Sequence, residues 1–245
     1  MMIYSHSRLE TFEKCKLKFK FKYIDKIVPE IGQSIEAHLG HVIHSTLEWL
    51  YHQVKKNQTP TIEQIISDYA QKWQAEFTED IVIIKKEFTE KDYFNKGVGF
   101  LVNYYMKHSP FKENTIAIEH KIELKLDEGI RIIGFIDRLV ENVENNEIEI
   151  HDYKTGNSMP TEKQMRENRQ LALYSLAIKE VFGKDKNICL IWHFLAHDVK
   201  VCIRKTNEEL ENLKQEIIDL IKIIEETKEF PPNNLSKKTD PFYPK

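Results

Sequence analysis

The chain has few of the residues that would make it a disulfide-stapled, membrane-spanning or modular protein. Its 245 residues include only three cysteines, Cys15, Cys189 and Cys202, too few and too scattered for a disulfide framework, so a cytoplasmic location is the default expectation. No apolar run approaches the roughly 18–20 residues that cross a bilayer, and the N-terminus lacks the apolar core of a secretory signal. Only 8 glycines and 8 prolines occur, with no internal repeat, which favours one compact domain.

A strong excess of positive charge is also missing. The net charge is −3, which excludes a histone-like protein that binds polyanions by bulk charge. The charge is nevertheless uneven, because residues 1–28 contain seven basic and three acidic side chains, a net charge of +4. Both a solvated helix face and a surface that follows a phosphate backbone explain such a run.

The hydrophobic pattern predicts helices first and strands second. Apolar residues at helical spacing predict helices over residues 7–23, 36–54, 61–77, 90–106, 161–181 and 206–228. Alternating patterns predict strands over residues 115–125, 131–140, 147–154, 187–196 and 200–205, with a hairpin turn at 144–146. The expected fold is therefore α/β (α+β): a central mixed sheet flanked by helices. We expect one domain over 1–245, with a mainly helical part (1–110), a catalytic sheet with its flanking helices (111–230) and an irregular tail (231–245).

The segment HDYKTG at residues 151–156 carries the most informative chemistry. Side chains alternate along a strand, so Asp152 and Lys154 lie on the same face as Ile148 and Ile150. A carboxylate and an ammonium at the end of an apolar stripe can present a metal ligand beside a cation. A terminal ion pair that reaches solvent is the alternative.

A second carboxylate, Asp137, strengthens the metal interpretation. It lies on the same strand face as Ile133, Phe135 and Leu139, and a charge on an apolar stripe is costly unless it is paired or binds a metal. The predicted hairpin brings Asp137 towards Asp152, and two hard carboxylates favour Mg²⁺ or Mn²⁺. The alternative is that Asp137 and Arg138 make ordinary edge-strand contacts.

Two helical segments add further candidates. His41 and His44 suggest zinc, but no third soft ligand stands at a typical spacing. Arg166, Gln170 and Tyr174 follow at i, i+4 and i+8 and would line one face of the predicted helix, where they could contact a phosphate chain and stack on bases. A generic solvent-facing stripe explains the same spacing.

Taken in order, these segments resemble the PD-(D/E)XK nuclease superfamily, and within it the RecB-type branch. That branch includes the nuclease domains of recombination helicases and the CRISPR-associated exonucleases. The resemblance covers about two-thirds of the chain and rests on five segments: SHSRLETFEKC (5–15), GHVIHSTLE (40–48), GFIDR (134–138), DYKTG (152–156) and QLALY (170–174).

The resemblance implies a restriction-endonuclease-like core and a role for each matching residue. The implied metal ligands are His44, Asp137, Asp152 and the carbonyl of Tyr153. Lys154 becomes the catalytic lysine beside the catalytic Asp137 and Asp152, while Gln170 and Tyr174 orient the substrate and the active site. Arg8 on the basic first helix and Arg166 are further candidates for substrate binding.

One departure from the branch concerns its iron–sulfur cluster, which many relatives hold with one N-terminal and three C-terminal cysteines. Cys15 takes the first position, but the segment 230–242 contains no cysteine, so we expect no iron–sulfur cluster and a packing role for Cys15.

The expected activity is hydrolysis of DNA phosphodiester bonds with one or two Mg²⁺ or Mn²⁺ ions. Exonuclease action in DNA repair, recombination or CRISPR-type processing is the favoured form, on single-stranded DNA or duplex ends and without a membrane. No G-x-x-x-x-G-K-[ST] loop occurs, so a helicase partner would be a separate chain. The alternatives are a silent module that binds DNA or a recombination partner, and a nuclease that acts on RNA.

Overall fold

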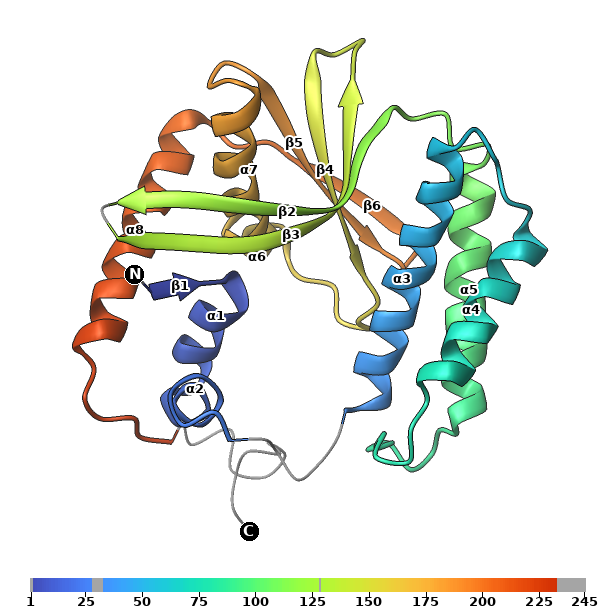
Figure 1. The fold of residues 1–245 in the computed structure, drawn as a ribbon, viewed down its shortest axis with the longest axis horizontal. Helices are drawn as coiled ribbons and strands as arrows, with labels where there is room; N and C mark the ends of the chain where they lie inside the picture. Colours follow the sequence, from blue (N-terminus) through green and yellow to red (C-terminus); the bar gives the residue numbers. More distant parts are fainter. Residues whose placement is uncertain (1, 28–32, 128, 233–245) are drawn as a thin grey trace.

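A mixed sheet of six strands forms the centre of the computed structural model, which describes residues 2–27, 33–127 and 129–232 (Figure 1). The strands are β1 (Met2–Tyr4), β2 (Thr115–Asp127), β3 (Ile130–Asn142), β4 (Glu147–Lys154), β5 (Asn187–Phe194) and β6 (Val199–Ile203). Their order is β1-β3-β4-β5-β6, and β2 pairs with β3. Helices flank this sheet, so the predicted fold class is confirmed.

Strand β3 organises the sheet because three strands pair with it. Antiparallel β2 runs along one edge of β3, so parallel β1 and antiparallel β4 share the other edge, at opposite ends. The β3–β4 ladder stops at the pair Arg138–His151, and beyond it β4 pairs only with β5. The two strands of the hairpin therefore diverge just where Asp137 and Asp152 follow.

The helices are α1 (His6–Lys14), α2 (Lys16–Phe19), the π-helical turn η1 (Lys20–Ile24), α3 (Ile35–Lys55), α4 (Ile62–Glu76), α5 (Glu90–His108), α6 (Glu162–Arg166), α7 (Arg169–Phe182) and α8 (Asn207–Glu226). Several begin at a hydroxyl cap that satisfies the free N–H groups of the first turn. Thr61, Thr89 and Thr206 each form a complete capping box, which fixes where α4, α5 and α8 start.

Two helices predicted as continuous are broken. The helix expected over 7–23 stops at Cys15, whose extended backbone (φ −161°) ends α1 and whose side chain caps α2. The helix expected over 161–181 stops after Arg166, and Asn168 starts α7 by accepting a hydrogen bond from the Gln170 N–H at 2.9 Å. Polar capping side chains override the apolar periodicity at both breaks.

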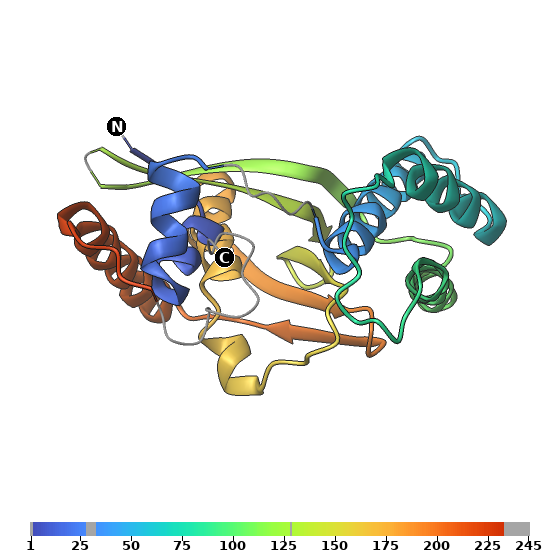
Figure 2. The same cartoon turned by 90° about the horizontal axis from the view of Figure 1, so that it is seen from below.

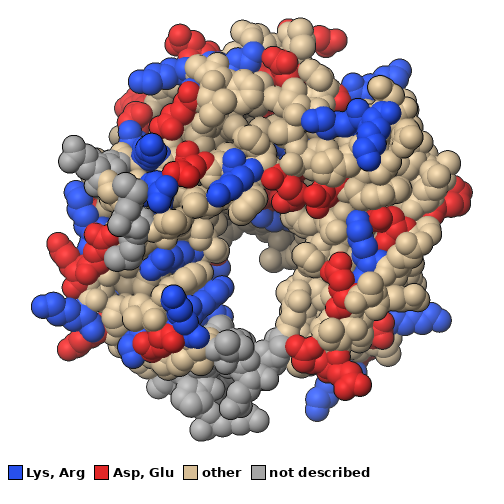
Figure 3. Space-filling model, in the orientation of Figure 1, with Lys and Arg blue, Asp and Glu red and all other residues tan. Residues whose placement is uncertain are grey.

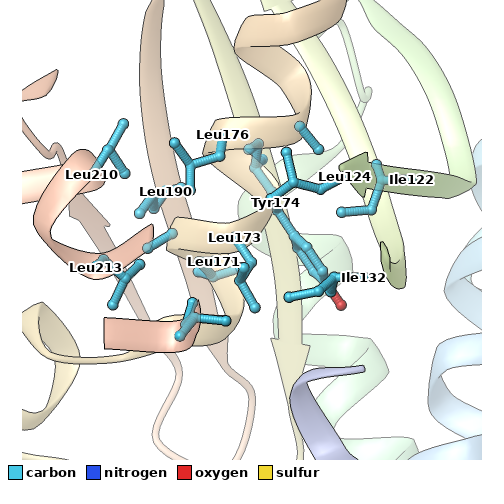
Figure 4. Packing of buried hydrophobic residues seen from close by; sticks show 14 of the residues in the cluster. Ile122, Leu124, Ile132, Leu171, Leu173, Tyr174, Leu176, Leu190, Leu210 and Leu213 are labelled. Carbon is cyan, nitrogen blue, oxygen red and sulfur yellow. The ribbon is translucent and has the colours of Figure 1, made fainter. Parts of the chain in front are cut away.

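The buried residues form two clusters on either side of the site. In the first, leucines of α7 pack between the sheet and α8, and the Tyr174 ring passes Ile132 with its hydroxyl directed away from those leucines (Figure 4). The second joins α3, α4 and α5 into a helical arm that stands to one side of the sheet (Figure 2). This arm is the expected N-terminal helical elaboration.

Three remaining expectations concern cysteines, termini and membranes. Cys189 on β5 and Cys202 on β6 form a disulfide, which their separation in the sequence did not lead us to expect. The predicted irregular tail falls mostly on residues 233–245, which lie outside the described residues. Among the helices described, none combines the length and the apolar character needed to cross a membrane.

Candidate active site

Asp137 on β3 and Asp152 on β4 face each other where the hairpin opens. The ladder ends one step earlier, at the pair Arg138–His151, so the same register continued would bring Asp137 across from Asp152. The two carboxylates do interact, because burial together with the Asp137 charge raises the pKa of Asp152. Asp137 Oδ2 accepts a hydrogen bond from the Tyr153 N–H at 2.8 Å, while Asp152 is buried with 4% of its surface exposed. The stripe that carries Asp137 is more open than predicted, because Phe135 is 53% exposed. The Asp137 side chain itself is only 14% exposed, so it remains a largely buried carboxylate that needs a partner or a metal ion.

Lys154 lies against Asp152 and is held by α7. Its Nζ is 2.7 Å from Asp152 Oδ2 and donates to Gln170 Oε1 at 3.2 Å. Burial alone would lower the pKa of Lys154, but the Asp152 carboxylate raises it above its usual value. Gln170 Nε2 in turn donates to the Tyr174 hydroxyl at 3.3 Å. A hydrogen-bonded chain thus leads from Tyr174 through Gln170 to the lysine ammonium.

His44 reaches the same point from helix α3. Its Nε2 lies 2.9 Å from the Tyr153 carbonyl, which can only accept, so Nε2 carries a hydrogen and Nδ1 faces Asp137 Oδ2 at 3.4 Å. Burial lowers the pKa of His44, but Asp137 reverses this effect and raises the pKa to about 9. The approach of α3 depends on Gly40, because a Cβ there would meet Thr155 Oγ1 at 3.2 Å. The Tyr153 carbonyl therefore holds His44 in orientation.

Glu119 on β2 is a further member of this site that the sequence reasoning missed. Glu119 lies between the ladder pairs Ile118–Arg138 and His120–Ile136. It is therefore opposite Asp137, which is on the neighbouring strand β3. Its backbone has φ 46°, a strained left-handed conformation that is uncommon outside functional positions in non-glycine residues. Burial, followed by the charges of Asp137 and Glu48, raises the pKa of Glu119 to about 7.

The donor atoms of His44, Glu119 and Asp137 fit a divalent metal ion. One ligand atom from each lies within 4.8 Å of the others. Carboxylate oxygens with one imidazole nitrogen suit Mg²⁺ or Mn²⁺, and a cation would relieve the repulsion that raises the pKa of Glu119. His41 does not join them, because its Nε2 pairs with Glu76 on α4 at 3.1 Å. Asp152 lies on β4, on the other side of the opening between β3 and β4 from Asp137.

Arg138 is a buried residue that supports this site. The alternative that it makes ordinary edge-strand contacts is therefore wrong. Its side chain is fully buried, with the guanidinium 4.0 Å from the Tyr51 ring centroid. It donates to the Tyr153 hydroxyl at 3.1 Å and to Glu113 at 2.7 Å. Because the backbone of Tyr153 contacts both His44 and Asp137, Arg138 holds in place the residue that joins the two strands of the site.

The two predicted substrate-binding arginines lie on α1 and α6. Arg166 ends α6 and pairs with Glu162 at 3.0 Å, so the prediction that it shares a helix face with Gln170 and Tyr174 is wrong. Arg8 packs its guanidinium among the rings of Tyr4, Phe19 and Tyr23 within the N-terminal segment. Its contact with substrate stays a prediction.

The surface is hollowed between the N-terminal helices and α3, and lysine and arginine side chains lie along the α1–α2 side of the hollow (Figure 3). Two residues of α1 lie close enough to the site to interact with Lys154, whose charge acts to lower the pKa of both His6 and Glu10. The predicted basic first helix therefore borders the approach to the carboxylates.

Comparison with known proteins identifies the family. The "Gene 69 protein" of Mycobacterium phage L5 is 45% identical over 62 residues, which are 25% of this chain and 18% of that protein. The chain thus matches less than a fifth of that relative's length. The solved structure "Crystal structure of SSO0001" aligns over 96% of this chain and 92% of its own at 13% identity, with a TM-score of 0.38 that is too low to indicate a function. A family model of the PD-(D/E)XK nuclease superfamily matches residues 3–237, and the chain belongs to that superfamily.

Proposed function

We propose that the chain is a deoxyribonuclease of the RecB-type branch that uses Mg²⁺ or Mn²⁺ and removes nucleotides from DNA ends. The observation that carries the proposal is the opposition of Asp137 and Asp152 where β3 and β4 diverge, with Lys154 paired to Asp152. A pair of carboxylates can hold a metal ion for phosphodiester hydrolysis, and a cation beside them can stabilise the charge that builds on the phosphate. The superfamily indicates a metal-dependent nuclease. The branch, the action on ends, the metal and the nucleic acid are our proposal.

His44, Glu119 and Asp137 would hold the first metal ion, and Asp152 lies where it can join them or hold a second. The carbonyl of Tyr153 is a further ligand in this proposal, in which it exchanges its hydrogen bond with His44 for the metal. When bound, such an ion supplies Lewis-acid activation of the phosphate and of the attacking water. Helix-borne His44, in place of a carboxylate, supports the RecB-type branch.

Lys154 acts on the phosphate rather than on the metal. In the resting protein Asp152 neutralises its ammonium and Gln170 fixes its position. As negative charge builds on the transferring phosphoryl group, the ammonium stabilises it as a point charge. Tyr174 contributes by holding Gln170 and, in this proposal, by contacting the substrate strand.

The hollow between the N-terminal helices and α3 supports a single strand or a duplex end as substrate (Figure 3). A hollow with lysines and arginines on one side suits a flexible phosphate chain, whose backbone can follow the basic side. We place the activity in DNA repair, recombination or CRISPR-type processing, with any helicase supplied by a separate chain.

The test is incubation of end-labelled single-stranded DNA, duplex DNA and RNA of one sequence with Mg²⁺, Mn²⁺ or EDTA. We expect DNA to be shortened from an end with either metal and to stay intact in EDTA or with Lys154→Ala. If only RNA were cleaved, the substrate would be RNA and the assignment of DNA as the substrate would be wrong. Tight DNA binding without cleavage under every metal condition would instead identify a silent binding module.

A further inference from the structure

A second site lies on the helical arm, where the segment between α4 and α5 meets the loop after β4. A cavity of about 240 Å³ is lined there by Lys85, Phe88, Asp92, Tyr93, Lys96 and Asn157. Asn157 follows Lys154 by three residues, so their Cα atoms are at most about 11 Å apart. The cavity is therefore a neighbour of the active site, although most of its wall belongs to the arm.

Two ammonium groups, those of Lys85 and Lys96, share this cavity without forming an ion pair. Burial and then repulsion from Lys85 lower the pKa of Lys96. Lys96 Nζ donates to Asn157 Oδ1, a neutral acceptor, and the described part of the chain offers neither lysine a carboxylate within ion-pair distance. Like charges held together at a cavity wall are unfavourable unless an anion joins them.

The nearby carboxylates are already committed to the protein. Asp92 lines the cavity, but its Oδ2 accepts from the N–H and the hydroxyl of Thr89, both at 2.7 Å, within the cap of α5. Glu36 accepts from the Tyr93 hydroxyl at 2.7 Å. Glu36 also attracts both lysines, since Lys85 contributes to lowering the pKa of Glu36 and Glu36 acts to raise the pKa of Lys96. Neither lysine forms an ion pair with these acids, so both lysines keep capacity for an external anion.

The cavity also presents an aromatic surface. Phe88 is 45% exposed and packs its ring edge-to-face with Tyr93, with ring centroids 6.0 Å apart. An exposed ring fixed in this way beside two cations is the combination that single-stranded nucleic acids use, since their bases stack and their phosphates pair with ammonium groups.

We propose that this cavity binds one nucleotide of the substrate strand next to the one being cleaved. Lys85 and Lys96 bind its phosphate, and its base stacks on Phe88. The inference rests on the proposed function, because it assigns to the same substrate a contact outside the metal site. It also gives the helical arm a role in substrate binding, since the arm determines how the strand leaves the hollow.

The test is equilibrium binding of a fluorescein-labelled single-stranded oligodeoxythymidylate, followed by anisotropy at several salt concentrations. All variants are made in the Lys154→Ala chain so that cleavage does not disturb the measurement. The cavity variants are Lys85→Gln/Lys96→Gln and Phe88→Ala. The matched control is Lys214→Gln/Lys222→Gln, which removes two lysines from α8, on the far side of the sheet from the arm.

We expect the double lysine variant to bind about tenfold or more weakly and to lower the magnitude of the salt slope by about 0.7, the value for one phosphate on a single strand. Phe88→Ala should weaken binding about 5- to 100-fold with the slope unchanged. The control should bind like the parent chain. Thermal unfolding checks that each variant is folded.

The outcome separates this inference from the proposed function. If the chain with Lys154 intact cleaves DNA while both cavity variants bind like the control, the cavity assignment is overturned and the nuclease assignment stands. If that chain cleaves no nucleic acid but the cavity variants still lose binding as described, the cavity assignment stands and the nuclease assignment fails.

Discussion

Replacing Gly134 with alanine tests the link between the sheet and the lysine most sharply. Gly134 lies on β3 three residues before Asp137, and a Cβ there would meet Cε1 of the Tyr174 ring at 2.5 Å. Its φ is not among the positive values, so the backbone itself accepts alanine. Only the Tyr174 ring opposes the substitution.

The size of the effect follows from that distance. Carbon atoms pack at about 3.5–4.0 Å, so the ring must retreat by about 1 Å. Overpacking of this kind costs about 1–3 kcal/mol, against a gain of about 0.4–1 kcal/mol from the lower entropy of the unfolded chain. The net loss in free energy of unfolding should be about 1–2 kcal/mol. Since Tyr174 holds Gln170 and Gln170 holds Lys154, cleavage should slow about 10- to 100-fold.

The assay is urea unfolding and single-turnover cleavage of Gly134→Ala, alone and combined with Tyr174→Ala. With the ring removed, alanine at 134 should become neutral or slightly stabilising, so the two substitutions should show strong coupling. Gly99→Ala on α5 is the control, because a Cβ there meets nothing within 4 Å. The reasoning is refuted if Gly134→Ala keeps wild-type stability and rate, or if its cost persists without the ring.

Three other predictions concern the buried support, the acidic cluster and the cysteine. Arg138→Met should lower the free energy of unfolding in urea by about 3–5 kcal/mol, because it leaves buried polar groups unpaired. The control Arg131→Met breaks a partly exposed ion pair on the same strand and should cost below about 1 kcal/mol. Similar losses in the two variants would contradict this prediction. In the metal-free protein Glu119 has a pKa of about 7 against 4.5 ordinarily, so its ionisation destabilises the fold as pH rises through that range. Glu119→Gln should therefore raise the melting temperature at pH 8 and leave it unchanged at pH 4, and a gain equal at both pH values would oppose the assignment. Purified protein should be colourless without stoichiometric iron, and Cys15→Ala should keep its activity; a brown preparation with bound iron would show otherwise.

Much of the fold was predictable because periodicity and capping agree over long segments. Helices α3, α4, α5 and α8 match the predicted ranges closely. The predictions failed where one side chain overrides a pattern. Cys15 and Asn168 each cap a new helix inside an apolar period, and the second break separates Arg166 from the site.

Only the part of the site that depends on strand alternation and on the β3–β4 hairpin was predictable from the sequence. The turn at 144–146 fixes the β3–β4 register, and that register brings Asp137 to Asp152. A second hairpin, with its turn near Gly129, sets the register of β2 against β3. Predicting that hairpin from the sequence would have placed Glu119 opposite Asp137. Arg138 could not be recognised as buried, because its partners Glu113, Tyr51 and Tyr153 come from three distant segments.

The central claim is that the carboxylates bind metal while Lys154 serves only the phosphate. The most direct test is metal titration by calorimetry and single-turnover DNA cleavage on the same three proteins: wild type, Asp137→Ala and Lys154→Ala. Asp137→Ala should lose both metal binding and cleavage. Lys154→Ala should bind metal at least as tightly as wild type, because it removes a nearby positive charge, and should cleave orders of magnitude more slowly. Unaltered metal affinity in Asp137→Ala, or near wild-type cleavage by Lys154→Ala, would contradict the account.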